Sequence, residues 1–174
     1  MSDTYQQTIK LRAVRAFTNS PVDAEDLLRI LEAGRWTGSS RNSQPWDLIV
    51  VSDPEIRRSL SRCGRFTGPI TAAPSCIVLV GRPGGSSFDI GRLAQNMMLA
   101  AAALGLGSCP VTLHNQNKAR AVLGVPEDHH CRYALAVGHP SPKAEGRVAR
   151  AFIPKGRRAL QTMVHLDQFG SRQI

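Results

Sequence analysis

The apolar positions along the chain alternate between two periods, one typical of buried strands and one typical of helices. Apolar runs predict buried strands at residues 46–51 and 75–80, an alternating β-rich pattern predicts a third strand at residues 131–137, and residues 108–113 also look extended. Apolar residues at helical spacing, with polar turn and capping residues between them, predict helices at residues 5–11, 23–35, 53–63, 87–104 and 116–123. Because helices and strands alternate, we expect a layered domain of α and β structure.

The predicted helix at residues 87–104 carries the strongest pattern. Ile90, Leu93 and Met97 lie on one stripe, and alanines and leucines continue around the opposite side. A helix that is apolar on nearly every side must be covered from both sides. In a domain of this size, one of the two covers can be another subunit.

Length and composition narrow the class of protein. A chain of 174 residues and 18.9 kDa fits one domain, and 42% hydrophobic with 20% charged residues indicates a globular protein. The longest apolar stretch is shorter than the roughly 20 residues that span a bilayer, so we predict no membrane association. Residues 1–5 lack the basic and apolar regions of a secretion signal, which predicts a cytoplasmic location.

The balance of charge indicates anionic partners. There are 22 Lys and Arg residues against 13 Asp and Glu, which gives a formal charge of +9. Aromatic residues make up only 5% of the chain and the basic residues are scattered, so we predict no nucleic-acid partner. The four cysteines show neither metal-binding nor disulfide spacing, so we expect buried, reduced thiols and no metal site.

Five segments, in order along nearly the whole chain, carry the resemblance to a known family. They are residues 12–17 (RAVRAF), 39–46 (SSRNSQPW), the Ala-rich helix that runs into 105–110 (GLGSCP), 122–126 (VLGVP) and 136–140 (AVGHP). Together they resemble the flavin-dependent nitroreductase superfamily.

The resemblance implies an α+β, three-layer fold with a central mixed, mainly antiparallel sheet flanked by helices. It also implies an intertwined homodimer, with the Ala-rich helix in the subunit contact. Residues 1–174 would then form a single nitroreductase-like domain, in which residues 141–174 are a C-terminal extension that reaches the partner subunit.

The resemblance further implies that FMN binds at the subunit interface. Arg15 matches a basic residue beside the N1 and C2 carbonyl edge of the flavin, where a fixed cation favours the anionic reduced form. Arg12, Lys155 and Arg157 resemble phosphate-binding residues, and guanidinium groups suit a phosphate because they bond two oxygens at once. Without the resemblance, Lys155 and Arg157 are equally explained as part of a solvated basic tail.

Two further segments complete the predicted cofactor site. Ser39, Ser40 and Asn42 match a polar loop that the opposite subunit supplies in the family, although such a loop can also simply connect a helix to a strand. Pro110, Val111 and Thr112 match the segment along the rear face of the flavin, where a backbone N–H near Thr112 would donate to N5. The alternative interpretation of this segment is an ordinary edge strand.

The chain departs from the family pattern in two places. Leu11 and Ala13 stand where the family often has Arg and Ser, so two phosphate donors are missing, although Ala13 stays within the predicted cofactor-binding segment. Longer members insert a helical flap after the second strand, whereas only residues 81–86 occupy that position here. We therefore expect an open substrate pocket, unless a partner completes it or Phe66 does so with its neighbours in residues 65–69.

The function implied by the resemblance is that of an FMN-dependent oxidoreductase. NADH or NADPH reduces the flavin, which then reduces a nitroaromatic compound, a quinone or another flat conjugated small molecule. The cofactor carries the chemistry, so no residue is assigned a catalytic role. Two alternatives stay open: a flavin-dependent oxidase that desaturates a small metabolite, as relatives that oxidise cyclic dipeptides do, and a protein that only binds flavin or deazaflavin. An additional small partner subunit also stays open.

Overall fold

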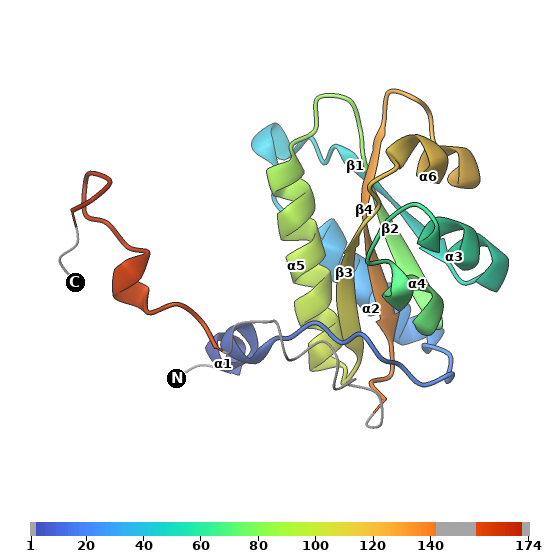
Figure 1. Ribbon diagram of the computed structural model, residues 1–174, viewed down its shortest axis with the longest axis horizontal. Helices are drawn as coiled ribbons and strands as arrows, with labels where there is room; N and C mark the ends of the chain where they lie inside the picture. The colour runs from blue at the N-terminus through green and yellow to red at the C-terminus, as the bar shows by residue number, and fades with distance from the viewer. Residues whose placement is uncertain (1–2, 142–155, 172–174) are drawn as a thin grey trace.

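The computed structural model describes residues 3–141 and 156–171, and Figure 1 shows a sheet with helices on both of its faces. The strands are β1 (Trp46–Val51), β2 (Ser75–Gly81), β3 (Gly107–Thr112) and β4 (His130–Gly138). The helices are α1 (Asp3–Lys10), α2 (Ala24–Arg35), α3 (Pro54–Ser61), α4 (Gly68–Ala72), α5 (Ser87–Ala103) and α6 (Gln116–Leu123). Two 3₁₀ turns, η1 (Ser40–Asn42) and η3 (Leu160–Thr162), accompany them. The predicted class of α and β structure is confirmed.

The strands lie in the order β1, β2, β4, β3, and each neighbouring pair is antiparallel. The predicted antiparallel character is therefore confirmed, and the described strands contain no parallel pair. Every residue of β2 is buried, because this strand has a neighbour on each side and helices over both faces. β1 and β3 form the two edges, where half of the backbone groups are not used by the sheet.

Successive side chains along each strand point to opposite faces of the sheet, and they pack into two separate hydrophobic cores. Cys76, Val78 and Val80 of β2 pack into the core that also contains buried residues of α3, α4 and α6. Ile77 and Leu79 point to the opposite face and pack with buried residues of α2 and α5. The molecule therefore has the three layers that the resemblance implied.

The pairing of α2 with α5 depends on a glycine. A Cβ atom at Gly34 would lie 2.9 Å from Met97 Cγ, which is closer than side chains normally pack. Leu93 and Met97 are completely buried, so the predicted apolar stripe of α5 is the one that faces the core. The N-terminus of α2 is capped as predicted, by Asp23, whose carboxylate accepts from the Glu25 amide at 2.8 Å.

One helix was not predicted. We expected residues 65–69 to form a loop, but α4 begins at Gly68 and buries Ile70 completely. Its five residues are too few to show a helical period in the sequence. Arg57 stabilises its C-terminal end, where Nη1 donates to the carbonyl of Ala73.

Residues 156–171 lie apart from the sheet and its helices, beyond α1 (Figure 1). Exposed apolar side chains occur at every third residue of this segment, at Leu160, Met163, Leu166 and Phe169. Exposure of this kind is unfavourable in water, which favours a partner surface for the segment. None of the helices in the described part of the chain has both the length and the apolar character needed to cross a membrane.

Candidate functional site

The open edge of β3 is the centre of the candidate site. Leu113 N donates to Arg132 O at 2.7 Å, which continues the hydrogen-bond ladder between β3 and β4. Because bonded positions alternate along an antiparallel strand, the main-chain groups of residues 108, 110 and 112 face away from β4. Pro110 suits this position because it has no N–H to leave unpaired. The amide of Thr112 therefore points toward the open side of the edge.

The segment that follows α1 runs along part of the same edge. Val14 N donates to Ser108 O at 2.9 Å, and the Val14 side chain lies so close to Gly107 that a Cβ there would be 2.8 Å away. This contact brings the exposed Arg15 near Cys109. Burial raises the pKa of the Cys109 thiol, and the positive charge of Arg15 acts in the opposite direction. The structure thus places Arg15 near Cys109, the residue directly before the predicted segment of residues 110–112.

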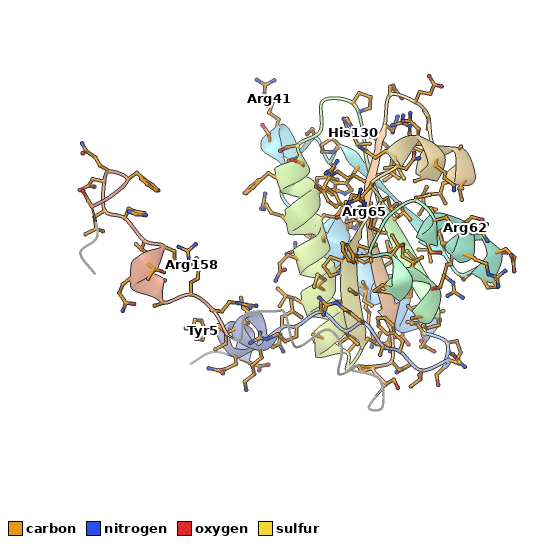
Figure 2. The ribbon with its side chains drawn as sticks, viewed as in Figure 1. Tyr5, Arg41, Arg62, Arg65, His130 and Arg158 are labelled. Atoms are coloured by element: carbon orange, nitrogen blue, oxygen red, sulfur yellow. The ribbon has the colours of Figure 1, made fainter. Side chains whose placement is uncertain are left out.

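A second segment, residues 62–67, lies against the far end of the same edge. A Cβ atom on Gly64 would be only 2.6 Å from the carbonyl oxygen of Thr112. Asn115 N donates to Cys63 O at 2.8 Å, and the Thr67 hydroxyl donates to the carbonyl of Ser61. These contacts fix the segment on both sides of Arg65, which Figure 2 places in front of the sheet.

The segments around this edge carry basic residues but no acidic ones. Residues 4–22, 56–88 and 90–126, which supply all three segments, contain no Asp or Glu. Arg15 and Arg65 make no side-chain hydrogen bond or ion pair with any other described residue. Several exposed arginines elsewhere do have such partners, as Arg82 shows by its two bonds to Asp47, at 2.6 and 2.8 Å. The edge of β3 therefore favours an anionic ligand.

Arg12 and Ala13, which we also predicted to bind the cofactor, already have partners within the protein. Arg12 Nη1 donates to the carbonyls of Ile9 and Leu11, at 2.8 and 2.7 Å, and so caps the end of α1. It also lines a cavity of about 420 Å³ between α1 and the end of α5. Ala13 is half-buried and packs against the hydrophobic core. The predicted contact of Arg12 with a phosphate, and the place of Ala13 in the cofactor-binding segment, stay predictions.

The predicted loop of Ser39, Ser40 and Asn42 lies elsewhere in the protomer. It sits near the start of α5, where Arg92 Nη1 donates to Gly38 O at 2.8 Å, whereas Arg12 lines a cavity with Ala102 near the end of α5. The rise of an α-helix puts about 15 Å along the axis between residues 92 and 102. Figure 2 shows the same separation, with Arg41 at one end of α5 and Tyr5 at the other. One protomer does not unite the two groups of predicted residues.

This loop adopts an unusual backbone. Arg41, Asn42 and Gln44 have positive φ angles of 54°, 54° and 46°, in the left-handed region that side chains disfavour. The loop keeps this shape because Ser39 Oγ accepts from Gln44 N at 2.9 Å, and Asn42 Oδ1 accepts from the Gln44 side chain at 3.1 Å. Strained backbone that is held by such bonds is typical of ligand-binding loops.

Three remaining expectations concern the tail, the thiols and metals. Arg157 is exposed in the C-terminal segment, and Lys155 lies outside the described residues. All four cysteines are buried and free, and burial raises the pKa of Cys76 to about 12 and that of Cys131 to about 11. Within the described residues, no cluster of His, Cys, Asp or Glu could hold a metal ion.

The donors at the β3 edge fit FMN. The Thr112 amide can donate to a ring nitrogen, Arg15 can balance negative charge on the reduced ring, and no carboxylate in these segments repels the phosphate. Sequence reasoning missed Gly64, whose lack of a side chain allows residues 62–67 to lie against Thr112. A lone glycine between Cys63 and Arg65 was its only sequence signal.

Comparison with known proteins shows what this chain is similar to. The sequence model of the nitroreductase family matches residues 10–63 and 69–139. The FMN reductase (NADPH) of Bacillus subtilis strain 168 is 28% identical over 167 residues, which cover 81% of this chain and 67% of the relative. The NfrA1 nitroreductase structure from B. subtilis superposes with a TM-score of 0.83 at 23% identity, covering 96% of this chain and 75% of that one. An FMN-dependent nitroreductase from Clostridium difficile R20291 has a TM-score of 0.74 at 26% identity, covering 92% of this chain and 96% of that one.

Proposed function

The chain belongs to the nitroreductase family, and on this basis we propose that it is an FMN-dependent oxidoreductase. NADH or NADPH is the electron donor, and the acceptor is a flat conjugated small molecule such as a nitroaromatic compound or a quinone. The names of the relatives support both the cofactor and the nicotinamide donor, since one is an FMN reductase (NADPH) and another an FMN-dependent nitroreductase.

A single juxtaposition carries the proposal: the outward-facing amide of Thr112 and the unpartnered guanidinium of Arg15, which lies near Cys109, belong to one edge whose three segments supply no Asp or Glu. Bound FMN would supply two-electron transfer between the nicotinamide and the acceptor. Arg15 would hold positive charge beside the ring and make its reduced, anionic form more favourable. The Thr112 amide would orient the ring, and the ladder between β3 and β4 would keep that amide in place.

We further propose that two copies of the chain form the complete site. The loop of residues 39–42 lies near the start of α5, whereas Arg12 and the first residues of β3 lie near its end, so a second copy packed antiparallel along α5 would bring one copy's loop to that end of the other's β3 edge. The outward side of α5 suits such a contact, because Gln95 and Ala102 are exposed and Leu99 is outside the hydrophobic cores. The exposed apolar residues of the tail also favour a partner.

Anaerobic spectroscopy of the purified protein tests the proposed function. We expect the protein to take up FMN, to lose the yellow flavin colour when NADH or NADPH is added, and to regain it when a quinone follows. Failure to bind FMN would contradict the proposal. Colour that persists with both nicotinamides, but bleaches with a small metabolite, would instead favour the oxidase alternative.

A further inference from the structure

Phe66 is 84% exposed although its backbone is firmly held. Residues 62–67 are fixed by the contact of Gly64 with Thr112 O, by the bond from Asn115 N to Cys63 O, and by the hydroxyl of Thr67. The segment therefore presents Phe66 to the solvent two residues away from its contact with Thr112. A large apolar ring displayed in this way is suited to stack on another planar molecule.

Arg65 adds charge at the same place. Its guanidinium has no acceptor among residues 3–141 and 156–171, and the surrounding segments supply no carboxylate. Arg58, only seven residues earlier, is paired with Glu55. An arginine without a partner next to an exposed aromatic ring matches a ligand that is both flat and negatively charged.

We infer that Arg65 and Phe66 select a planar acceptor that carries an acidic group, such as an aromatic carboxylate. The inference rests on the proposed function, which places the acceptor at the β3 edge beside Thr112. Phe66 contributes a stacking surface for the aromatic ring, and Arg65 pairs with the carboxylate. The turn at residues 82–86 is short, and within the part of the chain that the structure describes, residues 62–67 are placed to provide selectivity.

The reaction of 4-nitrobenzoate makes the inference testable. NADPH gives a hydride and the solvent gives a proton, so that one N–O bond of the nitro group breaks and its oxygen leaves as water. The products are 4-nitrosobenzoate and NADP⁺, and the carboxylate is unchanged. The neutral analogue 4-nitrobenzamide undergoes the same reaction without a charge for Arg65 to recognise.

We expect the wild-type protein to prefer 4-nitrobenzoate to 4-nitrobenzamide in kcat/KM. Arg65→Gln should lower kcat/KM for 4-nitrobenzoate about fivefold, as expected for a solvent-accessible charge pair, and leave 4-nitrobenzamide nearly unchanged. Phe66→Ala should lower kcat/KM for both compounds. The matched control is Arg62→Gln, which removes the same charge from a side chain that Figure 2 places on the outer flank beside α3.

A binding measurement provides a readout that does not depend on turnover. Benzoate, which cannot be reduced at a nitro group, is titrated calorimetrically into the FMN-loaded protein. Its dissociation constant should rise about fivefold in Arg65→Gln and stay at the wild-type value in Arg62→Gln. Equal benzoate binding in all three proteins, or equal use of the two nitro compounds, would overturn the inference. If FMN does not bind at all, both the proposed function and the inference are wrong. If FMN binds and NADPH reduces it, the proposed function holds and these measurements test the inference alone.

Discussion

Gly64 and Thr112 are in direct contact across the candidate site, and there is no room between them for a side chain. A Cβ at position 64 would lie 2.6 Å from Thr112 O, and the neighbour is main chain that cannot rotate away. We therefore expect Gly64→Ala to destabilise the protein by about 1 to 3 kcal/mol, measured by urea unfolding. Gly68→Ala is the control, because nothing lies within 4 Å of its Cβ position. Similar stability of the two variants would contradict this contact.

Arg15→Gln should weaken FMN binding and make the flavin harder to reduce. Loss of a charge-assisted contact predicts a dissociation constant about tenfold higher, and loss of the cation lowers the reduction potential. Both are measured on the purified protein, by fluorescence titration of FMN and by spectroelectrochemistry. Arg62→Gln removes the same charge from a side chain on the outer flank beside α3 and should leave both values unchanged. A wild-type potential in Arg15→Gln would argue against the assigned position of the ring.

If two copies share the site, a substitution that breaks the dimer should also weaken FMN binding. Leu99→Arg places a charge on the outward side of α5, where burial without a partner is costly. Sedimentation should then show the monomer, and the monomer should retain little FMN because the two groups of site residues are separated. Ile56→Arg, on the exposed side of α3, is the matched control. A Leu99→Arg dimer with full FMN content would contradict the shared site.

The ion pair of Asp47 with Arg82 predicts a small pH effect on stability. The hydrogen bond from Arg82 lowers the pKa of Asp47 below its ordinary value. A carboxylate with a depressed folded-state pKa adds stability above its unfolded-state pKa, and this stability is lost as the pH falls through the folded-state value.

Both side chains of this pair are about half exposed, so solvent screening limits its effect. Asp47→Asn should cost about 0.5 kcal/mol at neutral pH in urea unfolding, and the difference should vanish in acid or in concentrated salt. Glu127→Gln, which removes an exposed carboxylate that has no ion pair with any described residue, should show no such pH dependence. A constant Asp47→Asn deficit across the pH range would rule out the ion pair as its cause.

Several parts of the fold were determined by the sequence alone, because they depend on local patterns. Apolar runs located β1, β2 and β4, and Asp23 marked the start of α2 before any contact was known. Five segments in order along the chain, residues 39–46 and 105–110 among them, indicated the family. The helix α4 was missed because five residues show no period, so its position depends on the packing of Ile70 in the core.

Only the tertiary structure decided how the site is assembled. The direction of the Thr112 amide depends on the register between β3 and β4, which strand propensity does not specify. The contact of Gly64 with Thr112 joins two segments far apart in the chain. Likewise, the distance along α5 between Asn42 and Arg12 follows from helix packing. These relationships arise from long-range contacts, whereas the sequence determines directly only what neighbouring residues impose on each other.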